Sequence, residues 1–174
     1  MLRILFAVVR FDPSAYRHVA SSPAATLPSL IVVAMAAGGH AAWALARSAQ
    51  EPGSADRLTV ALAAISLEVL LFLALGAAIF TIARSSGRDI GVLSLLRPLG
   101  FAQAPAVLYV FGLLPPLTHF MPLLPLVLAW RLGTSVLVAV HIARLRLPVA
   151  VATVLAGAAA GVFLGFTAAS CLYG

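Results

Sequence analysis

Long apolar runs separated by short polar segments constrain this chain more than any other feature. The first run extends from Leu27 to Ala46, and about 20 residues are enough for a helix to cross the roughly 30 Å hydrocarbon core of a bilayer. Hydrophobic residues make up 63% of the chain and charged residues 9%, against roughly 45–50% and about 25% in soluble domains. Such a chain cannot cover its surface with polar groups in water. We therefore predict an all-α integral membrane protein, a polytopic bundle of transmembrane helices.

Polar segments and prolines divide the apolar sequence into five predicted spans. A cluster of four prolines, at positions 115, 116, 122 and 125, interrupts the apolar stretch from Leu99 to Ile142, and proline pairs are not tolerated inside a regular helix. The predicted spans are about 27–46, 58–83, 99–114, 121–142 and 148–173. The segment before the third span, with Ile90, Leu93, Leu95 and Leu96, is expected at the membrane interface. The sequence leaves open whether the Pro115–Pro125 connection is a loop or a re-entrant segment.

The chain is expected to have two parts, an N-terminal segment of residues 1–26 and a transmembrane domain of residues 27–174. The N-terminal segment is predicted to be amphipathic and interfacial, with Leu2, Leu5, Phe6 and Val9 facing lipid. Asp12-Pro13 is typical of an N-cap followed by the first helical residue, so a short surface helix is expected after it.

The arginine residues predict the orientation in the membrane. There are no lysines, and with the N-terminus inside, eight arginines fall in inner segments and two, Arg47 and Arg57, in outer ones. Inner segments of membrane proteins are enriched in basic residues. We therefore expect a cytoplasmic N-terminus and an external C-terminus. The high content of alanine and arginine and the absence of lysine indicate a GC-rich bacterial genome, so the expected membrane is a bacterial inner membrane. Because the basic residues do not gather on one face, nucleic acid is not an expected partner, and membrane lipids are.

Two ionisable residues lie deep in predicted spans, Glu68 in the second and Arg131 in the fourth. Each is about ten residues past the outer start of its span, which places both roughly 15 Å into the membrane. An unpaired charge there costs about 2.5–3.5 kcal/mol or more, so we expect the two to pair. The pair either fixes helix packing or belongs to a polar cavity, a proton relay or a substrate site.

Three further polar residues lie within spans: His40, Gln103 and His141. His40 and Gln103 are expected to hydrogen-bond neighbouring helices. The histidines fall on different helices at different depths, and the single cysteine, Cys171, has no ligand cluster around it. We therefore predict neither a metal site nor a cofactor.

Small residues recur at every fourth position of the fifth span: Thr153, Gly157, Gly161, Gly165 and Ala169. A stripe of this kind allows two helix backbones to approach closely. It predicts a packed face, whose partner is either another helix of the same chain or another protomer or membrane protein.

Catalytic signatures are absent from the sequence. It has no GxSxG, HExxH or Walker A motif and no paired cysteines, and each of these would mark a recognisable chemistry. Only five residues are acidic. We therefore do not expect an enzyme.

Several segments of the sequence resemble the bacterial branch of the Yip1 family. They are GRDIG, LRPLGFAQAPAVL, LPP and LVLAWRLGTSVLVAVHIA, between Gly87 and Ile142, together with Phe11-Asp12-Pro13 and Ala15 before the first span. The resemblance implies a small five-helix membrane bundle. Eukaryotic members act in vesicle trafficking and bind prenylated GTPases through membrane and cytosolic regions, whereas this chain has only a short N-terminal segment in place of their long cytosolic one.

Three functional hypotheses follow. The leading one is a non-enzymatic membrane protein that organises lipids or partner proteins through its bundle. The second is a small-molecule or ion transporter, or a transporter subunit, that uses the Glu68/Arg131 layer. A polar cavity that reaches this layer would favour the transporter, and a closed, dry pair would favour the organising role. A lipid-modifying enzyme is the third, for which the sequence offers few convergent polar groups.

Overall fold

The computed structural model describes residues 7, 10, 12–49, 56–113 and 123–173, and within these it contains helices and no strands. The elements are α2 (Pro13–Ser21), η1 (Pro23–Ala25), α3 (Thr26–Ser48), α4 (Arg57–Ser85), α5 (Val92–Phe101), η2 (Ala104–Leu113), α7 (Leu123–His141) and α8 (Leu147–Tyr173). The predicted all-α fold is confirmed. The proposed interfacial face of Leu2, Leu5, Phe6 and Val9, and the connection between the third and fourth spans up to residue 122, lie outside the described residues.

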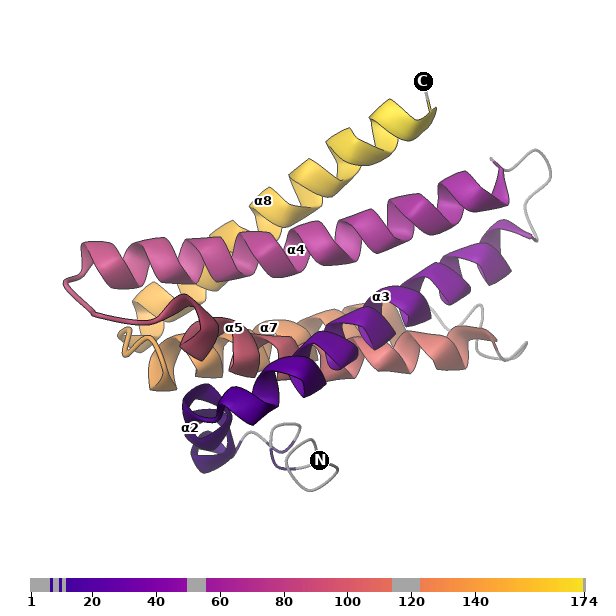
Figure 1. Ribbon diagram of the computed structural model, residues 1–174. Coiled ribbons are helices and arrows are strands. Elements are labelled where there is room, and N and C mark those ends of the chain that lie inside the picture. Colours follow the sequence, from indigo (N-terminus) through magenta and orange to yellow (C-terminus); the bar gives the residue numbers. More distant parts are fainter. Residues whose placement is uncertain (1–6, 8–9, 11, 50–55, 114–122, 174) are drawn as a thin grey trace.

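The long helices run back and forth along one axis (Figure 1). From α3 onward, each of α4, the α5–η2 segment, α7 and α8 reverses the direction of the element before it. The connections α4–α5 and α7–α8 therefore lie at the same end of the bundle as the start of α3, together with α2. We call this the arginine-rich end, because six exposed arginines lie in or beside these segments: Arg10, Arg17, Arg84, Arg88, Arg144 and Arg146.

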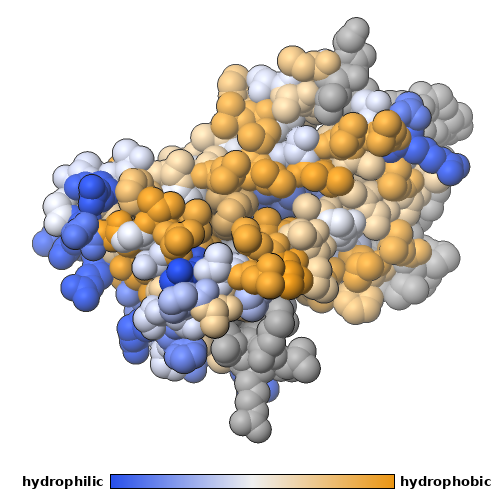
Figure 2. Space-filling model, in the orientation of Figure 1, coloured by the Kyte–Doolittle hydropathy of each residue, from blue (hydrophilic) through white to orange (hydrophobic). Residues whose placement is uncertain are grey.

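Four helical segments are long and apolar enough to cross a membrane: Pro23–Ser48, Arg57–Ser85, Val92–Phe111 and Leu147–Cys171. The apolar stretch of α7, Pro125–His141, is shorter. Large apolar side chains on the outside agree with a lipid surrounding, since Leu27, Phe163 and Phe166 are 68–70% exposed. Figure 2 shows a broad hydrophobic surface between hydrophilic residues at the two ends.

The third span differs from its predicted start at Leu99. Helix α5 begins at Val92, and Leu95, expected at the membrane interface, is 1% exposed within the main hydrophobic core. Leu93, Leu95 and Leu96 fit either a buried helix or an interfacial one, because the two kinds of helix have similar apolar composition. The preceding Gly91 at the N-cap marks where the helix begins.

Helix α2 is packed into the bundle. Asp12 caps it, and the hydrogen bonds from the Ser14 hydroxyl and backbone N–H lower the pKa of the Asp12 carboxyl. Tyr16 and Val19 are fully buried in the same core as Leu95. Arg97 of α5 donates hydrogen bonds to the Thr26 hydroxyl and the Ala20 carbonyl, at 2.8 and 3.2 Å. These contacts join α2 and the start of α3 to the third span.

Candidate functional site

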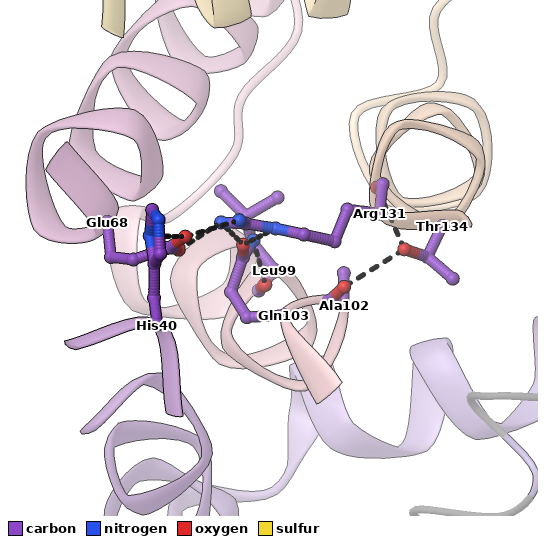
Figure 3. Close-up of polar contacts among 7 residues, drawn as sticks. All are labelled: His40, Glu68, Leu99, Ala102, Gln103, Arg131 and Thr134. Atoms are coloured by element: carbon purple, nitrogen blue, oxygen red, sulfur yellow. Dashed lines mark hydrogen bonds and ion pairs between the residues drawn. The ribbon is translucent and has the colours of Figure 1, made fainter. Parts of the chain in front are cut away.

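The polar centre of the bundle is built from four side chains on separate elements: His40 of α3, Glu68 of α4, Gln103 between α5 and η2, and Arg131 of α7 (Figure 3). Arg131 extends from α7 past the α5–η2 turn toward Glu68. We call these four residues the polar network. It connects every long helix of the bundle except α8.

Glu68 and Arg131 form a two-pronged ion pair. Arg131 Nη1 lies 3.0 Å from Glu68 Oε1, and Nη2 lies 2.8 Å from Oε2. The two side chains are 4% and 3% exposed. Parallel hydrogen bonds of this geometry are the strongest arrangement of an arginine and a carboxylate. The charges cancel within the pair, so the bundle interior does not contain a net charge from it.

Gln103 holds the other edge of the guanidinium group. Its side-chain oxygen accepts from Arg131 Nε at 2.8 Å and also from Nη2. Its side-chain nitrogen donates to the Leu99 carbonyl at 3.1 Å. Arg131 is therefore bonded to a carboxylate on one side and an amide oxygen on the other, and a guanidinium group has no acceptor function to offer a ligand.

The sequence explains why Gln103 is available here. Pro105 has no backbone N–H and cannot donate to Phe101, so α5 ends at Phe101 and the chain tightens into η2. The backbone N–H of Gln103 then pairs with Gly100 instead of Leu99. The Leu99 carbonyl, which loses its helical partner, accepts from the Gln103 side chain instead. In lipid such replacement is required, because no water reaches an orphaned carbonyl.

Thr134 repairs the same helix break from the opposite helix. The backbone N–H of Ala106 pairs with Gln103, so the Ala102 carbonyl also lacks a helical partner. The Thr134 hydroxyl lies 3.0 Å from that carbonyl and within reach of its own helix carbonyls at Trp130 and Arg131. The break in the third span is thus the point where α7 is attached, both through Arg131 and through Thr134.

His40 joins the network from α3, and an aromatic cluster surrounds it. Its Nδ1 atom lies 2.9 Å from Glu68 Oε1. The ring centroids of Trp43 and Tyr109 lie 5.8 and 5.1 Å from the imidazole, and the Arg47 guanidinium lies over Trp43 at 5.7 Å. His40 is the least buried of the four, with a side chain 12% exposed.

A pocket formed by described residues lies against the network. It has a volume of about 230 Å³ and lies between α3, α4 and α8, with His40 on its wall. Its other lining residues are apolar, among them Ala44, Ala63, Phe166 and Ala169. The ion pair itself is not on this wall, so contact between the pocket and Glu68 passes through the imidazole of His40.

The small-residue stripe of α8 packs on α4 of the same chain. A Cβ atom added to Gly157 would lie 3.0 Å from the Ala78 methyl, and one added to Gly161 would lie 2.6 Å from the Leu71 backbone. One added to Gly165 would collide with the Leu67 side chain. Thr153 is buried as well, whereas Ala169 lies on the His40 pocket. Of the two partners left open by the sequence, the intramolecular one is present in the structure.

The structure brings together four of the polar residues singled out from the sequence and leaves His141 apart, near the arginine-rich end of α7. Depth suggested that Glu68 and Arg131 pair, but it did not place His40 beside them. His40 lies eight residues from the end of α3 and Glu68 eleven residues from the start of α4, depths of roughly 12 and 16 Å. A glutamate side chain spans this difference. Among the described residues, no cluster of three or more histidine, cysteine or acidic side chains could hold a metal ion.

No family model matches the sequence, and neither a curated protein nor a solved structure matches it.

Proposed function

We propose that this chain is a non-enzymatic, Yip1-like membrane protein that organises anionic lipids or partner proteins at the cytoplasmic face of a bacterial inner membrane. The observation that carries the proposal is the contrast between a closed centre and an exposed basic end. The side chains of Glu68 and Arg131 are 4% and 3% exposed and satisfy each other's charge. A pair in this state stabilises the helix arrangement and is not open to a passing solute.

The arginine-rich end supplies the surface for such a role. Of the six arginines there, Arg84 pairs with Asp89 at 2.8 Å, and its side chain is 55% exposed. Hydrophilic residues form a patch at this end of the molecule in Figure 2. An arginine close to an anionic membrane surface contributes about 1 kcal/mol of attraction. Several arginines on one end therefore favour phosphatidylglycerol-like or cardiolipin-like headgroups over zwitterionic ones.

The proposed topology has five spans with the N-terminus inside. Helix α7 covers Leu123–His141, 19 residues, or roughly 28 Å at 1.5 Å per residue. The alternating direction of the five segments in Figure 1 supports this count. It puts the arginine-rich end on the cytoplasmic side, as the enrichment of basic residues in inner segments requires.

The Yip1-like assignment is part of the proposal and rests on the sequence segments from Gly87 to Ile142. These segments supply the α5–η2 break, through Pro105, and Arg131 of the polar network. If the assignment is correct, other chains with the same segments should keep an acidic residue opposite the arginine of the fourth span.

The lipid-organising function is testable with charge-matched variants. We would purify the chain in mild detergent and identify the lipids and proteins that co-purify. Replacing Arg88 and Arg146 by Gln should reduce binding of anionic lipid about thirtyfold, since two arginines contribute about 2 kcal/mol. The matched control replaces Arg47 and Arg57, at the other end, and should leave binding unchanged. Equal retention of anionic lipid by both double variants would contradict the proposal.

Topology is tested separately by labelling. In a Cys171→Ser background, a cysteine at Ser86 should react with an impermeant maleimide only from the cytoplasmic side, and one at Ala49 only from outside. The reverse pattern would invert the orientation.

A transporter remains the second candidate because the His40 pocket reaches one member of the polar network. This function requires the ion pair to open to water from at least one side. Solvent-accessibility labelling of a cysteine at Ala64, one turn before Glu68 on α4 and on the wall of the His40 pocket, separates the two candidates. Labelling from the aqueous phase favours the transporter, and resistance favours the organising role.

A further inference from the structure

The pocket beside His40 has a shape suited to a small apolar molecule. Its volume is about 230 Å³, and a cavity of about 150 Å³ is enough to bind benzene. Alanines from three helices, including Ala44, Ala63 and Ala169, leave this space because none fills it with a longer side chain. Phe166 on its rim is 70% exposed, so the pocket opens on the outer, lipid-facing surface. A ligand would enter from the membrane.

The hydrogen bond to Glu68 determines what His40 offers to this pocket. Glu68 pairs with Arg131, so its carboxylate is ionised and can only accept. His40 Nδ1, 2.9 Å away, must therefore carry a hydrogen. The single negative charge is already balanced by Arg131, so a protonated His40 would add an uncompensated charge inside the membrane. In the neutral imidazole with Nδ1–H, Nε2 is an acceptor.

We propose that this His40 pocket binds a membrane-soluble alcohol or phenol. The apolar body of the ligand lies among Ala63, Leu67 and Ala169. Its hydroxyl group donates a hydrogen bond to Nε2 of His40, which is fixed in the accepting form by Glu68. The site discriminates against ligands without a donor, because a buried acceptor left unpaired is unfavourable. The inference does not rest on the lipid-organising function, since the pocket lies away from the arginine-rich end.

The test compares 4-butylphenol with butylbenzene, which differ by one hydroxyl group. Binding to the full chain in nanodiscs is measured by equilibrium dialysis against nanodiscs without protein, so that partition into lipid is subtracted. We expect saturable binding of 4-butylphenol, about five- to tenfold tighter than that of butylbenzene, the size of one hydrogen bond. Equal affinities, or no saturable binding of the phenol, would overturn the proposal.

Two variants place the binding in this pocket. Ala169→Phe fills the pocket and leaves the polar network unchanged, so both probes should bind at least tenfold more weakly. Ala159→Phe introduces the same ring at an exposed position of α8 and should have no effect. His40→Leu should retain butylbenzene and lose the preference for the phenol. Unchanged binding in Ala169→Phe, or a preference kept in His40→Leu, contradicts the assignment. If His40→Leu does not fold, the probe pair and the two phenylalanine variants still decide the outcome.

Discussion

Helix α4 packs on its neighbours in two different ways. One face carries Glu68, which joins α3 and α7 through hydrogen bonds and an ion pair. The other face receives the glycine residues of α8, with backbones close enough that a Cβ atom on Gly161 would lie 2.6 Å from Leu71. The first contact depends on which atoms donate and accept, and the second on how little space a residue occupies.

These two contacts explain how such a bundle holds together without a hydrophobic effect between its helices. Lipid tails are as apolar as leucine, so association depends on close packing and on polar contacts that lipid cannot provide. The α4/α8 contact uses the first and the polar network the second. A change in side-chain chemistry should therefore weaken the polar network and leave the α4/α8 contact intact. A change in side-chain size should have the reverse effect.

The largest expected effect comes from breaking the ion pair. Arg131→Met leaves Glu68 buried with His40 as its remaining partner in the network. Loss of one member of a buried pair costs about 3–5 kcal/mol. We expect this decrease in the free energy of unfolding, measured by titrating detergent-solubilised protein with dodecyl sulfate. A decrease below about 1 kcal/mol would mean that the pair contributes little to the bundle.

Gln103→Leu should have the next largest effect. It removes the acceptor for Arg131 Nε and the donor for the Leu99 carbonyl. A hydrogen bond to a charged group contributes about 1.5–3 kcal/mol, so we expect a loss of this size in the same titration. A loss no larger than that of Thr134→Val would contradict the role of Gln103 as a partner of the charged Arg131.

Gly161→Ala tests the α4/α8 contact through a change in side-chain size alone. The added methyl group meets the Leu71 backbone, and overpacking costs about 1–3 kcal/mol. Gly38→Ala is the matched control, since an added Cβ there has nothing within 4 Å. Because alanine has a higher helix propensity than glycine, the free energy of unfolding of Gly38→Ala should rise by up to about 1 kcal/mol. Similar melting temperatures for the two variants would mean that the α4/α8 approach is not close in solution.

Thr134→Val should have the smallest effect. It removes a neutral hydrogen bond to the Ala102 carbonyl and keeps the shape of the side chain. Such bonds between membrane helices contribute about 0.6 kcal/mol on average. Ser135→Ala is the control, because the buried Ser135 hydroxyl has no hydrogen-bond partner in the described part of the chain. A loss as large as that of Gln103→Leu would show that hydrogen bonds to the charged Arg131 contribute no more than neutral ones.

Much of the fold could be predicted from hydropathy, because spans in lipid must be long and apolar. The bounds of α3, α4 and α8 differ from the predicted spans by at most two residues. The start of the third span was wrong by seven residues, since Leu93–Leu96 fits either an interfacial or a buried helix. The η2 segment was also missed. A proline such as Pro105 ends or kinks an α-helix, but it does not specify that the chain continues as a 3-10 helix.

The candidate site was predictable in part. Glu68 and Arg131 could be identified as a pair because an isolated charge is energetically unfavourable in lipid. The sequence gives no comparable constraint on Gln103 and His40, since their place beside the pair depends on helix rotation, which a single sequence does not specify. The pocket was not predictable at all. It results from alanines on three helices that are far apart in the chain.

A double-mutant cycle on Glu68 and Arg131 tests most directly our central claim that a closed ion pair holds the bundle together. We would measure the free energy of unfolding of Glu68→Met, Arg131→Met and the double variant. We predict that each single variant loses about 3–5 kcal/mol and that the double variant loses no more than either, because removing both charges leaves none unpaired. Losses that add within about 0.5 kcal/mol would contradict the claim.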